Sequence, residues 1–256
     1  MRLDLYLSSK GLVKSRTRAS EMISGGFVTV NGKSITKPAY DVDENDSVTI
    51  TGEEHGFVGR GGMKLDGALD VFGISVDGFV CADIGASTGG FTDCLLQRGA
   101  SRVYAVDSGH GQLDEKLRND PRVINLEGIN ARYMDGETLP EKCDIAAADL
   151  SFISQTLVLG GMTNILKPGG TVVTLIKPQF ECGKSALSKN GIVRDKKQHI
   201  AAIRQVLSCA VSVGLMPQKI TASQITGGDG NREFLMFATL GGIVNVTEND
   251  IRETVG

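Results

Sequence analysis

The chain has 256 residues, of which 41% are apolar, and its net charge of -3 excludes a protein that is basic throughout. No segment approaches the roughly 18 consecutive apolar residues of a membrane span, and we expect neither secretion nor membrane insertion. The five cysteines are scattered without a C-x-x-C pair, which is typical of reduced thiols in a cytoplasmic protein, so we expect no metal site.

Residues 1–52 have the pattern of a small α+β domain. Apolar spacing predicts two short helices, one starting at Leu3 and one running from Ser15 to Ile23. A strand is expected at 27–30, followed by an Asn31-Gly32 turn, with further strand at Val42 and at 48–50. Asn-Gly is the strongest short signal for a hairpin.

Positive charge is concentrated in this first region. Residues 1–37 hold seven basic residues against Asp4 and Glu21, a net charge of +5. A solvated helix face is one explanation, but cations clustered at the start of a helix favour phosphate binding. The predicted RNA-binding residues of this region are Arg2, Lys10, Lys14, Arg16, Arg18, Lys33 and Lys37.

Residues 53–62 are predicted to be a glycine-rich linker. Five glycines among residues 51–62 argue against a helix there, and Arg60 is a further candidate for RNA contact. We expect the next helix to begin at Met63, with Lys64 in its first turn. A cation in that position opposes the helix dipole, which hints at a functional role for Lys64.

Residues 63–256 alternate between strand and helix patterns. Near-continuous apolar strands between helices predict an α/β domain with a seven-stranded, mostly parallel sheet and an antiparallel last strand. The expected strands are 79–84, 102–106, 122–126, 143–148, 170–176, 217–223 and 234–240. The expected helices are 90–98, 112–118, 154–166 and 195–213.

The stretch 80–93 has the pattern of a strand, a tight turn and a helix start. Gly85, Gly89 and Gly90 leave the backbone bare for a ligand, but their spacing is not G-x-G-x-x-G, and the lysine of a phosphate-binding loop is missing. Asp83 precedes the first glycine. A carboxylate there repels phosphate and suits a cationic or amino-bearing ligand.

Asp107 ends the next strand, about twenty residues further on, where an acid accepts from both ribose hydroxyls of a nucleoside. The alternative is an aspartate that caps a turn. Glu127 and Asn130 follow the third strand, where an adenine would lie, although either could be a loop or cap residue. S-adenosylmethionine fits this set. The predicted cofactor-binding residues are Asp83, Gly85, Ala86, Ser87, Thr88, Gly89, Gly90, Phe91, Asp107, Ser108, Glu127, Asn130 and Asp149.

Three ionisable residues lie at the ends of later strands. Asp149 and Lys177 end the fourth and fifth strands, and Glu233 precedes the last one. A lysine that closes a buried strand is costly unless it is paired, so we expect the two acids to pair with Lys177. A structural ion-pair network is the alternative to a catalytic role, but the neighbouring methyl-donor loop favours catalysis.

Two resemblances to known families follow from these motifs. Residues Arg2-Leu3-Asp4, Ser15-Arg16 and 26–33 (Gly-Phe-Val-Thr-Val-Asn-Gly-Lys) resemble the S4 RNA-binding domain. The set Lys64, Asp149, Lys177 and Glu233, together with the glycine loop, resembles the Lys-Asp-Lys-Glu tetrad of FtsJ-type RNA ribose 2′-O-methyltransferases. An S4 domain joined to such a domain resembles the TlyA family, whose members are often labelled haemolysins.

The resemblance implies a Rossmann-like class I methyltransferase domain over 63–256. It also implies S-adenosylmethionine as cofactor and a ribose 2′-oxygen of ribosomal RNA, in a cytidine of the large subunit, as acceptor. We expect Lys177 to act as general base or to orient the hydroxyl, and Lys64 to hold the target ribose or phosphate. Positioning alone can supply much of the acceleration, so no metal is expected. We expect a monomer.

Three other functions remain open at this point. A pore-forming haemolysin would need a secretion signal and an amphipathic or spanning segment. A non-catalytic RNA-binding ribosome-assembly factor would need only the S4 region. A base methylase would need a proline or a nucleophilic cysteine in the motif where this chain has Asp-Leu-Ser-Phe, although Cys143 and Cys182 are nearby in the sequence.

Overall fold

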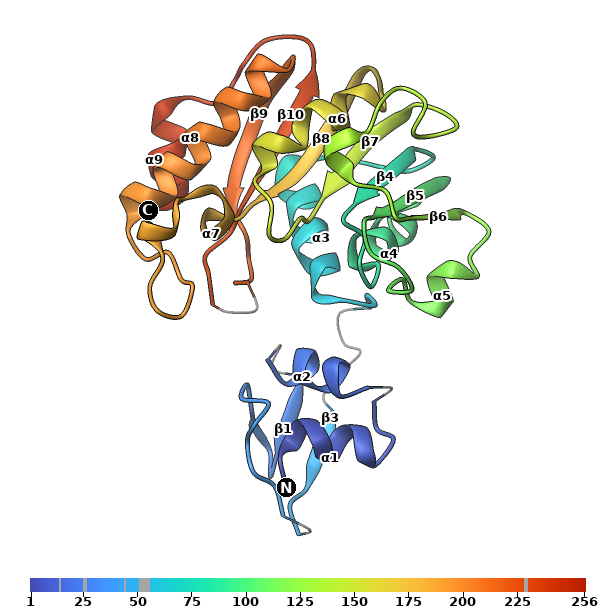
Figure 1. Ribbon diagram of the computed structural model, residues 1–256, viewed down its shortest axis with the longest axis vertical. Helices are drawn as coiled ribbons and strands as arrows, with labels where there is room; N and C mark the ends of the chain where they lie inside the picture. The colour runs from blue at the N-terminus through green and yellow to red at the C-terminus, as the bar shows by residue number, and fades with distance from the viewer. Residues whose placement is uncertain (14, 25–26, 44, 51–55, 228–229) are drawn as a thin grey trace. The chain divides into compact units, whose positions relative to one another are not determined.

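The computed structural model describes residues 1–13, 15–24, 27–43, 45–50, 56–227 and 230–256. These residues form two compact units, Met1–Gly56 and Phe57–Gly256 (Figure 1). Each unit has its own hydrophobic core, so each is described separately.

The N-terminal unit packs two helices, α1 (Leu3–Ser9) and α2 (Arg16–Ser24), against a small antiparallel sheet of order β2-β1-β3. Its strands are β1 (Val28–Val30), β2 (Lys33–Ser34) and β3 (Val48–Ile50). Asn31 and Gly32 have φ angles of 51° and 76°, as the predicted hairpin turn requires. Val42 is buried but lies in no strand; the residue before it, Asp41, forms an isolated β-bridge with Arg2.

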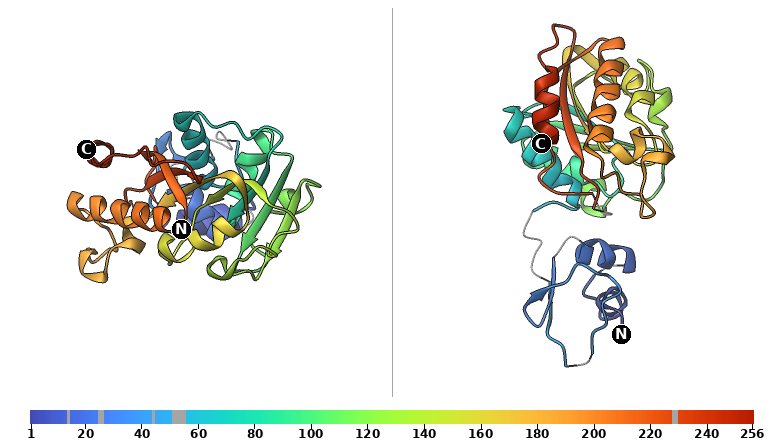
Figure 2. Two further views of the ribbon diagram at one scale, coloured as in Figure 1. Left: turned by 90° about the horizontal axis from the view of Figure 1, so that it is seen from above. Right: turned by 90° about the vertical axis from the view of Figure 1, so that its left-hand side faces the viewer.

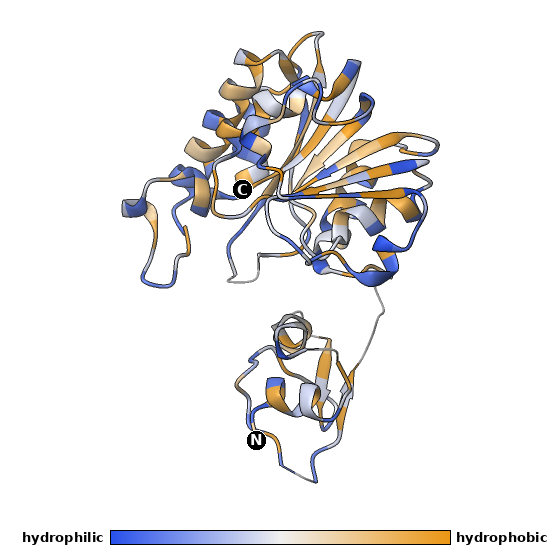
Figure 3. Cartoon of the chain, turned by 45° about the vertical axis from the view of Figure 1, so that its right-hand side comes forward, coloured by the Kyte–Doolittle hydropathy of each residue, from blue (hydrophilic) through white to orange (hydrophobic). Residues whose placement is uncertain are grey.

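The larger unit is built on the seven-stranded, mostly parallel sheet that the sequence predicts. Its order is β6-β5-β4-β7-β8-β10-β9, and β10 is antiparallel to both of its neighbours. Figure 3 shows that the strands are predominantly apolar, as expected for strands covered on both faces. The strands are β4 (Val80–Ile84), β5 (Arg102–Asp107), β6 (Val123–Glu127), β7 (Cys143–Ala148), β8 (Leu166–Ile176), β9 (Leu215–Ala222) and β10 (Phe234–Leu240).

Helices cover both faces of this sheet (Figure 2). One face packs against α3 (Arg60–Phe72), α4 (Gly90–Gln97) and α5 (Glu115–Arg118). The other packs against α6 (Leu159–Asn164), α8 (Lys196–Ser212) and α9 (Glu248–Val255). None of the helices among the described residues is long and apolar enough to cross a membrane.

Two helices were not predicted from the sequence. The short helix α7 (Pro178–Glu181) follows Lys177 directly, with its proline in the first turn, where a missing N–H costs nothing. Helix α9 starts at a capping box in which the side chains of Thr247 and Asp250 bond each other's backbone N–H groups.

Helix α3 starts at Arg60, three residues before the predicted start at Met63. The glycines of its first turn allow close packing: a Cβ on Gly62 would lie 2.4 Å from the ring of Phe57, and one on Gly90 would lie 2.9 Å from the backbone nitrogen of Gly62. Residues 60–62 are helical, so the prediction of a glycine-rich linker over 53–62 was wrong at these three residues. Lys64 lies in the second turn, where the argument from the helix dipole no longer applies.

Candidate active site

The carboxyl ends of the parallel strands bring the predicted catalytic residues to one edge of the sheet. Ala148 pairs with Thr174 across β7 and β8, so Asp149 and Lys177 leave the sheet on the same side. Phe234 pairs with Ile176 in the antiparallel strand β10, which places Glu233 beside Lys177 at that edge. Helix α3 brings Lys64 to the same place.

The four side chains form a continuous chain of opposite charges. Lys177 Nζ lies 2.5 Å from Asp149 Oδ1, and Lys64 Nζ lies 2.6 Å from Glu233 Oε2 and 3.9 Å from Asp149 Oδ2. Lys64 and Lys177 are each only 8% exposed, and Glu233 is 3% exposed. Two cations and two anions balance, as buried charges require.

The pairing differs from the prediction in one respect. Glu233 bonds Lys64, whereas Lys177 forms an ion pair with Asp149 and donates a hydrogen bond to Ser151 Oγ at 3.1 Å. Helix α3 is the cause, because it carries Lys64 against both carboxylates. Gly227 allows this arrangement, since a Cβ there would lie 2.5 Å from Glu233 Oε1.

Asp83 is fully buried at the end of β4 and carries one unsatisfied oxygen. Its Oδ2 accepts hydrogen bonds from the backbone N–H and the hydroxyl of Thr92, at 2.8 and 2.7 Å. Its Oδ1 has no partner among the described residues. Burial raises the pKa of Asp83 to about 7, against the lowering effect of Thr92. A buried carboxylate oxygen without a partner suits a cationic ligand.

The loop after Asp83 contains glycines whose left-handed backbone angles and close neighbours leave no place for a side chain. Gly85 has φ +83°, and a Cβ there would lie 2.9 Å from the carbonyl oxygen of Asp149. Gly89 has φ +97°, and a Cβ there would lie 2.2 Å from Leu117. Ser87 is also left-handed, with φ 48°. Ala86 is buried and Thr88 half-buried in this loop, and Gly90 and Phe91 are buried at the start of α4.

Asp107 is placed where its carboxylate ties two loops together. Its Oδ2 accepts from the N–H of Ser87 at 2.8 Å, and its Oδ1 accepts from the N–H of Gly109 at 2.7 Å. This is the turn-capping alternative of the sequence analysis, but each oxygen keeps a further lone pair for a ligand hydroxyl. Asp107 can therefore shape the loop and contact a ribose at once.

The other predicted cofactor residues lie on the same edge with local roles of their own. Ser108 is exposed directly after Asp107. Glu127 accepts from Asn125 at 3.1 Å, and the backbone N–H of Gly111 lowers its pKa. Asn130 caps a 3₁₀ turn by accepting from the N–H of Arg132.

In the N-terminal unit, two of the predicted RNA-binding residues surround one buried acid. Asp4 accepts from Arg2 Nε and its terminal nitrogen at 3.0 and 2.8 Å, and from Arg16 Nε at 3.1 Å. The hydrogen bonds of Arg2 contribute most to a lowered pKa of about 2 for Asp4. About half of each arginine side chain stays exposed, so both can still reach phosphate.

The remaining basic candidates are spread over both units. Lys10 lies 5.9 Å from the ring centre of Tyr6, and Lys33 and Lys37 are exposed. Arg60 donates to the carbonyl oxygen of Thr226 at 3.0 Å in the larger unit. Lys14 and the side chain of Arg18 lie outside the described residues.

Phe152 is a site residue that the sequence reasoning did not select. Its side chain is 91% exposed, it lies one residue after Ser151, and its φ of 63° is left-handed. Such a conformation in a residue other than glycine costs about 1–3 kcal/mol and is often found at functional sites. The available signal was the motif Asp-Leu-Ser-Phe, but an aromatic residue there reads equally well as core.

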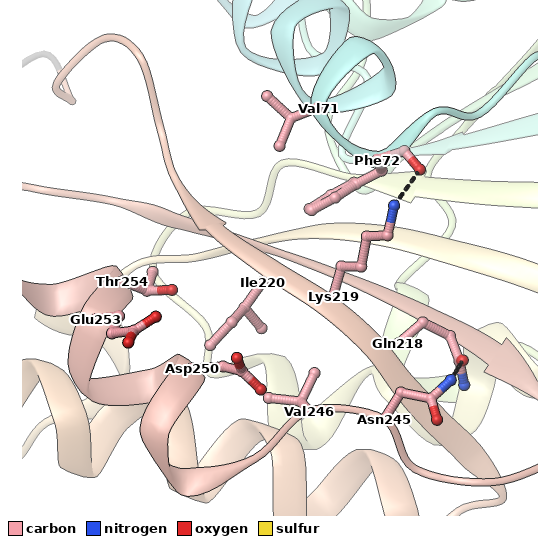
Figure 4. A pocket seen from close by; sticks show the side chains of 10 residues that line it. All are labelled: Val71, Phe72, Gln218, Lys219, Ile220, Asn245, Val246, Asp250, Glu253 and Thr254. Atoms are coloured by element: carbon pink, nitrogen blue, oxygen red, sulfur yellow. Dashed lines mark hydrogen bonds between the residues drawn. The ribbon is translucent and has the colours of Figure 1, made fainter.

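A pocket of about 340 Å³ lies away from this edge, between the end of α3, the edge strand β9 and α9 (Figure 4). Lys219 donates to the carbonyl oxygen of Phe72 across it at 2.9 Å. None of the predicted catalytic or cofactor-binding residues lines it, so the predicted chemistry does not depend on it.

Comparison with known proteins assigns the two units. A model of the FtsJ-like methyltransferase family matches residues 57–240, and a model of the S4 domain matches residues 1–48. A Mycobacterium tuberculosis relative named 16S/23S rRNA (cytidine-2′-O)-methyltransferase TlyA is 41% identical over 237 residues, which cover 92% of this chain and 88% of the relative. The chain belongs to the TlyA family.

Two further TlyA-family matches carry the other name that the sequence suggested. Hemolysin A of Brachyspira hyodysenteriae is 42% identical over 236 residues, covering 92% of this chain and 98% of that protein. A solved structure described as a hemolysin from Streptococcus thermophilus is 40% identical, with a TM-score of 0.81, and covers all of this chain and 94% of that one. The predicted S4 and FtsJ-like organisation is confirmed.

Proposed function

We propose that this TlyA-family chain methylates a ribose 2′-oxygen of ribosomal RNA, with S-adenosylmethionine as methyl donor. The observation that carries the proposal is the convergence of Lys64, Asp149, Lys177 and Glu233 at the sheet edge beside the glycine loop. Two buried lysines held by two carboxylates are suited to orienting a hydroxyl.

The residues present fit S-adenosylmethionine. The unpaired Oδ1 of Asp83 offers a negative partner for its cationic part. Gly85 has no space for a side chain beside Asp149 and Leu150, so its glycine lets the loop pack directly against the strand end that carries Asp149. The free lone pairs of Asp107 suit the ribose hydroxyls. When bound, the cofactor supplies an electrophilic methyl group.

Lys177 is our candidate for contact with the acceptor hydroxyl. Asp149 and Ser151 fix the direction of its ammonium group, at 2.5 and 3.1 Å. Lys64 links Glu233 to Asp149, so in this proposal it sets the orientation of both carboxylates; contact with the target ribose or phosphate remains its second predicted role. Alignment of the hydroxyl before the reaction supplies the acceleration.

The exposed ring of Phe152 is suited to stacking on the acceptor nucleotide. A ribose that reacts at this buried edge must belong to a nucleotide turned out of its stack, and an aromatic ring compensates for the lost stacking. The S4 domain would supply backbone affinity for structured RNA. We propose a cytidine of large-subunit rRNA as the target, modified in the cytoplasm by a monomer.

Transfer of labelled methyl groups to unmodified ribosomal RNA tests the proposal. The wild-type chain is expected to label RNA at a ribose 2′-oxygen, and Lys177→Ala to lose roughly 10²-fold or more in rate, because a misplaced reactant costs about that much. Separate assays with small- and large-subunit RNA identify the target. Full activity of Lys177→Ala, or label on a base, would contradict the proposed site.

A further inference from the structure

The loop that follows β7 is tied to helix α7 at two points, one on each side of Phe152. Before Phe152, Lys177 donates to Ser151 Oγ at 3.1 Å. After Phe152, Glu181 accepts from Ser154 Oγ at 2.5 Å and from the N–H of Gln155 at 2.8 Å. Lys177 caps the start of α7 and Glu181 ends it, so one short helix holds both ends of the exposed segment.

Glu181 is placed to act on the loop, because both of its side-chain hydrogen bonds go to loop residues. It is 8% exposed, and burial raises its pKa. No lysine or arginine pairs with it among the described residues, although burial of a carboxylate normally demands a cation. Both of its oxygens are instead used on Ser154 and Gln155, and the side chain of Gln155 is itself fixed to the carbonyl oxygen of Leu175 at 2.9 Å.

The segment between the two ties is strained and exposed. Phe152 keeps a left-handed backbone, and its ring lies against that of Phe180 in α7, with ring centres 5.3 Å apart. A strained residue keeps its conformation only when its surroundings restrain it. On the C-terminal side of Phe152, Glu181 restrains Ser154 and Gln155, in addition to the hydrogen bond of Gln155 to Leu175 and the packing of Ile153 against the core.

We propose that Glu181 is a positioning residue of the methyl-transfer site, which holds the 151–155 loop so that Phe152 and Ser151 meet the acceptor nucleotide. This inference rests on the proposed function. The proposed roles of Glu181 and Asp83 differ, because Glu181 acts on the acceptor side of the site and has no effect on the cofactor loop.

The test compares Glu181→Ala with Glu181→Gln in the full chain. The glutamine can accept from the N–H of Gln155 and donate to Ser154 Oγ, so it restores both ties. We expect Glu181→Ala to lose about 10²-fold in kcat/KM for RNA, since a shift of 1 Å has that effect, and Glu181→Gln to stay within about threefold of wild type. The affinity for S-adenosylmethionine, measured by calorimetry, should be unchanged in both.

Asp144→Ala is the matched control. Asp144 also accepts from a backbone N–H, that of Val80 at 2.9 Å, and it pairs with Lys167 at 2.7 Å near the start of β7. The Asp144→Ala variant should have a lower melting temperature but an unchanged kcat/KM for RNA at a temperature where the chain is folded. An equal loss of kcat/KM in Asp144→Ala and Glu181→Ala would overturn the positioning role, as would a loss in Glu181→Gln as large as in Glu181→Ala.

Hydrogen exchange separates this inference from the proposed function. Glu181→Ala should speed amide exchange at residues 151–155 but not at 85–91, whether or not the wild-type chain methylates RNA. Unchanged exchange at 151–155 would overturn the proposal even in an active enzyme. A wild-type chain without methyl transfer would refute the proposed function and, with it, the positioning role of Glu181, even if the exchange result held.

Discussion

Two buried aspartates, one in each unit, have opposite electrostatic environments. Asp4 in the S4 domain is 2% exposed and has a pKa lowered to about 2. Asp83 in the FtsJ-like domain is fully buried and has a pKa raised to about 7. Both side chains are shielded from solvent, but desolvation in the deep interior of the larger unit is the main influence on the pKa of Asp83, whereas the hydrogen bonds from Arg2 are the main influence on the pKa of Asp4. The difference therefore comes from the depth of burial and from the partners together.

Asp4 has arginine partners for both of its oxygens, whereas only one oxygen of Asp83 has a hydrogen-bond partner among the described residues. Arg2, Arg16 and the N–H of Leu5 all donate to Asp4, and they favour its charged form. Asp83 receives hydrogen bonds from Thr92 alone, and Asp149 and Asp107 add negative charge nearby. Burial of an acid therefore does not by itself mark a ligand site, and the unused oxygen of Asp83 is the feature that favours one there.

The largest expected effect is on cofactor affinity. Asp83→Asn keeps an acceptor for Thr92 but removes the negative charge, and should weaken S-adenosylmethionine binding about 10²-fold, the value of a strong charged hydrogen bond. Calorimetry measures it, with Asp4→Asn as the control that should bind normally. Equal affinity in Asp83→Asn and wild type would remove Asp83 from the site.

The pH dependence should differ in sign between the two acids. The folded chain keeps a proton on Asp83 that the unfolded chain loses between its ordinary pKa of 3.8 and about 7, so this residue's contribution to stability falls as pH rises through that window. A cationic ligand favours the charged form of Asp83. The affinity for it should therefore increase as the pH rises towards 7, by at most about tenfold per pH unit. Calorimetric titrations between pH 5.5 and pH 8, roughly spanning that pKa, measure the effect; a flat profile would contradict it.

The stability that Asp4 contributes should change only at acidic pH. Its pKa of about 2 lies below the ordinary 3.8, so the stability it provides is present above about pH 4 and is lost as the pH falls towards 2. Hydrogen exchange at acidic pH should show loss of protection confined to residues 1–56. An equal loss of protection in both units would contradict this prediction.

A smaller effect separates two glycines of similar conformation. Gly85 and Gly73 have φ angles of +83° and +70°, but only Gly85 has a neighbour that a Cβ would strike. Gly85→Ala should weaken S-adenosylmethionine binding about fivefold beyond any effect of Gly73→Ala, the ratio that about 1 kcal/mol produces. Equal affinities in the two variants would show that the close packing of Gly85 against Asp149 and Leu150 does not control cofactor binding.

The smallest effect concerns the S4 domain alone. Asp4→Asn keeps some hydrogen bonds to Arg2 and Arg16 but loses their charge pairing, and should lower the melting temperature of that unit by roughly 5 °C. Differential scanning calorimetry should show the FtsJ-like transition unmoved. A shift of both transitions together would mean that the two units unfold as one.

The sequence by itself determined the S4 and FtsJ-like organisation, the seven strands and the residues at the strand ends. Parallel strands send their carboxyl ends to one edge, so Asp149 and Lys177 could be placed together from the strand pattern alone. The local signals of Asn31-Gly32 and of the 80–93 stretch depend on a few neighbouring residues, which is why they were readable.

Only the tertiary structure decided how these residues are partnered. The pairing of Lys64 with Glu233 depends on where α3 begins, and the glycines that start it serve close packing, which a sequence pattern cannot distinguish from a flexible linker. The exposure of Phe152 and its support by Glu181 depend on a contact between segments 26 residues apart. Asp83 could be selected from its position, but its unused oxygen and its contrast with Asp4 follow from which hydrogen-bond donors the fold brings to each carboxylate.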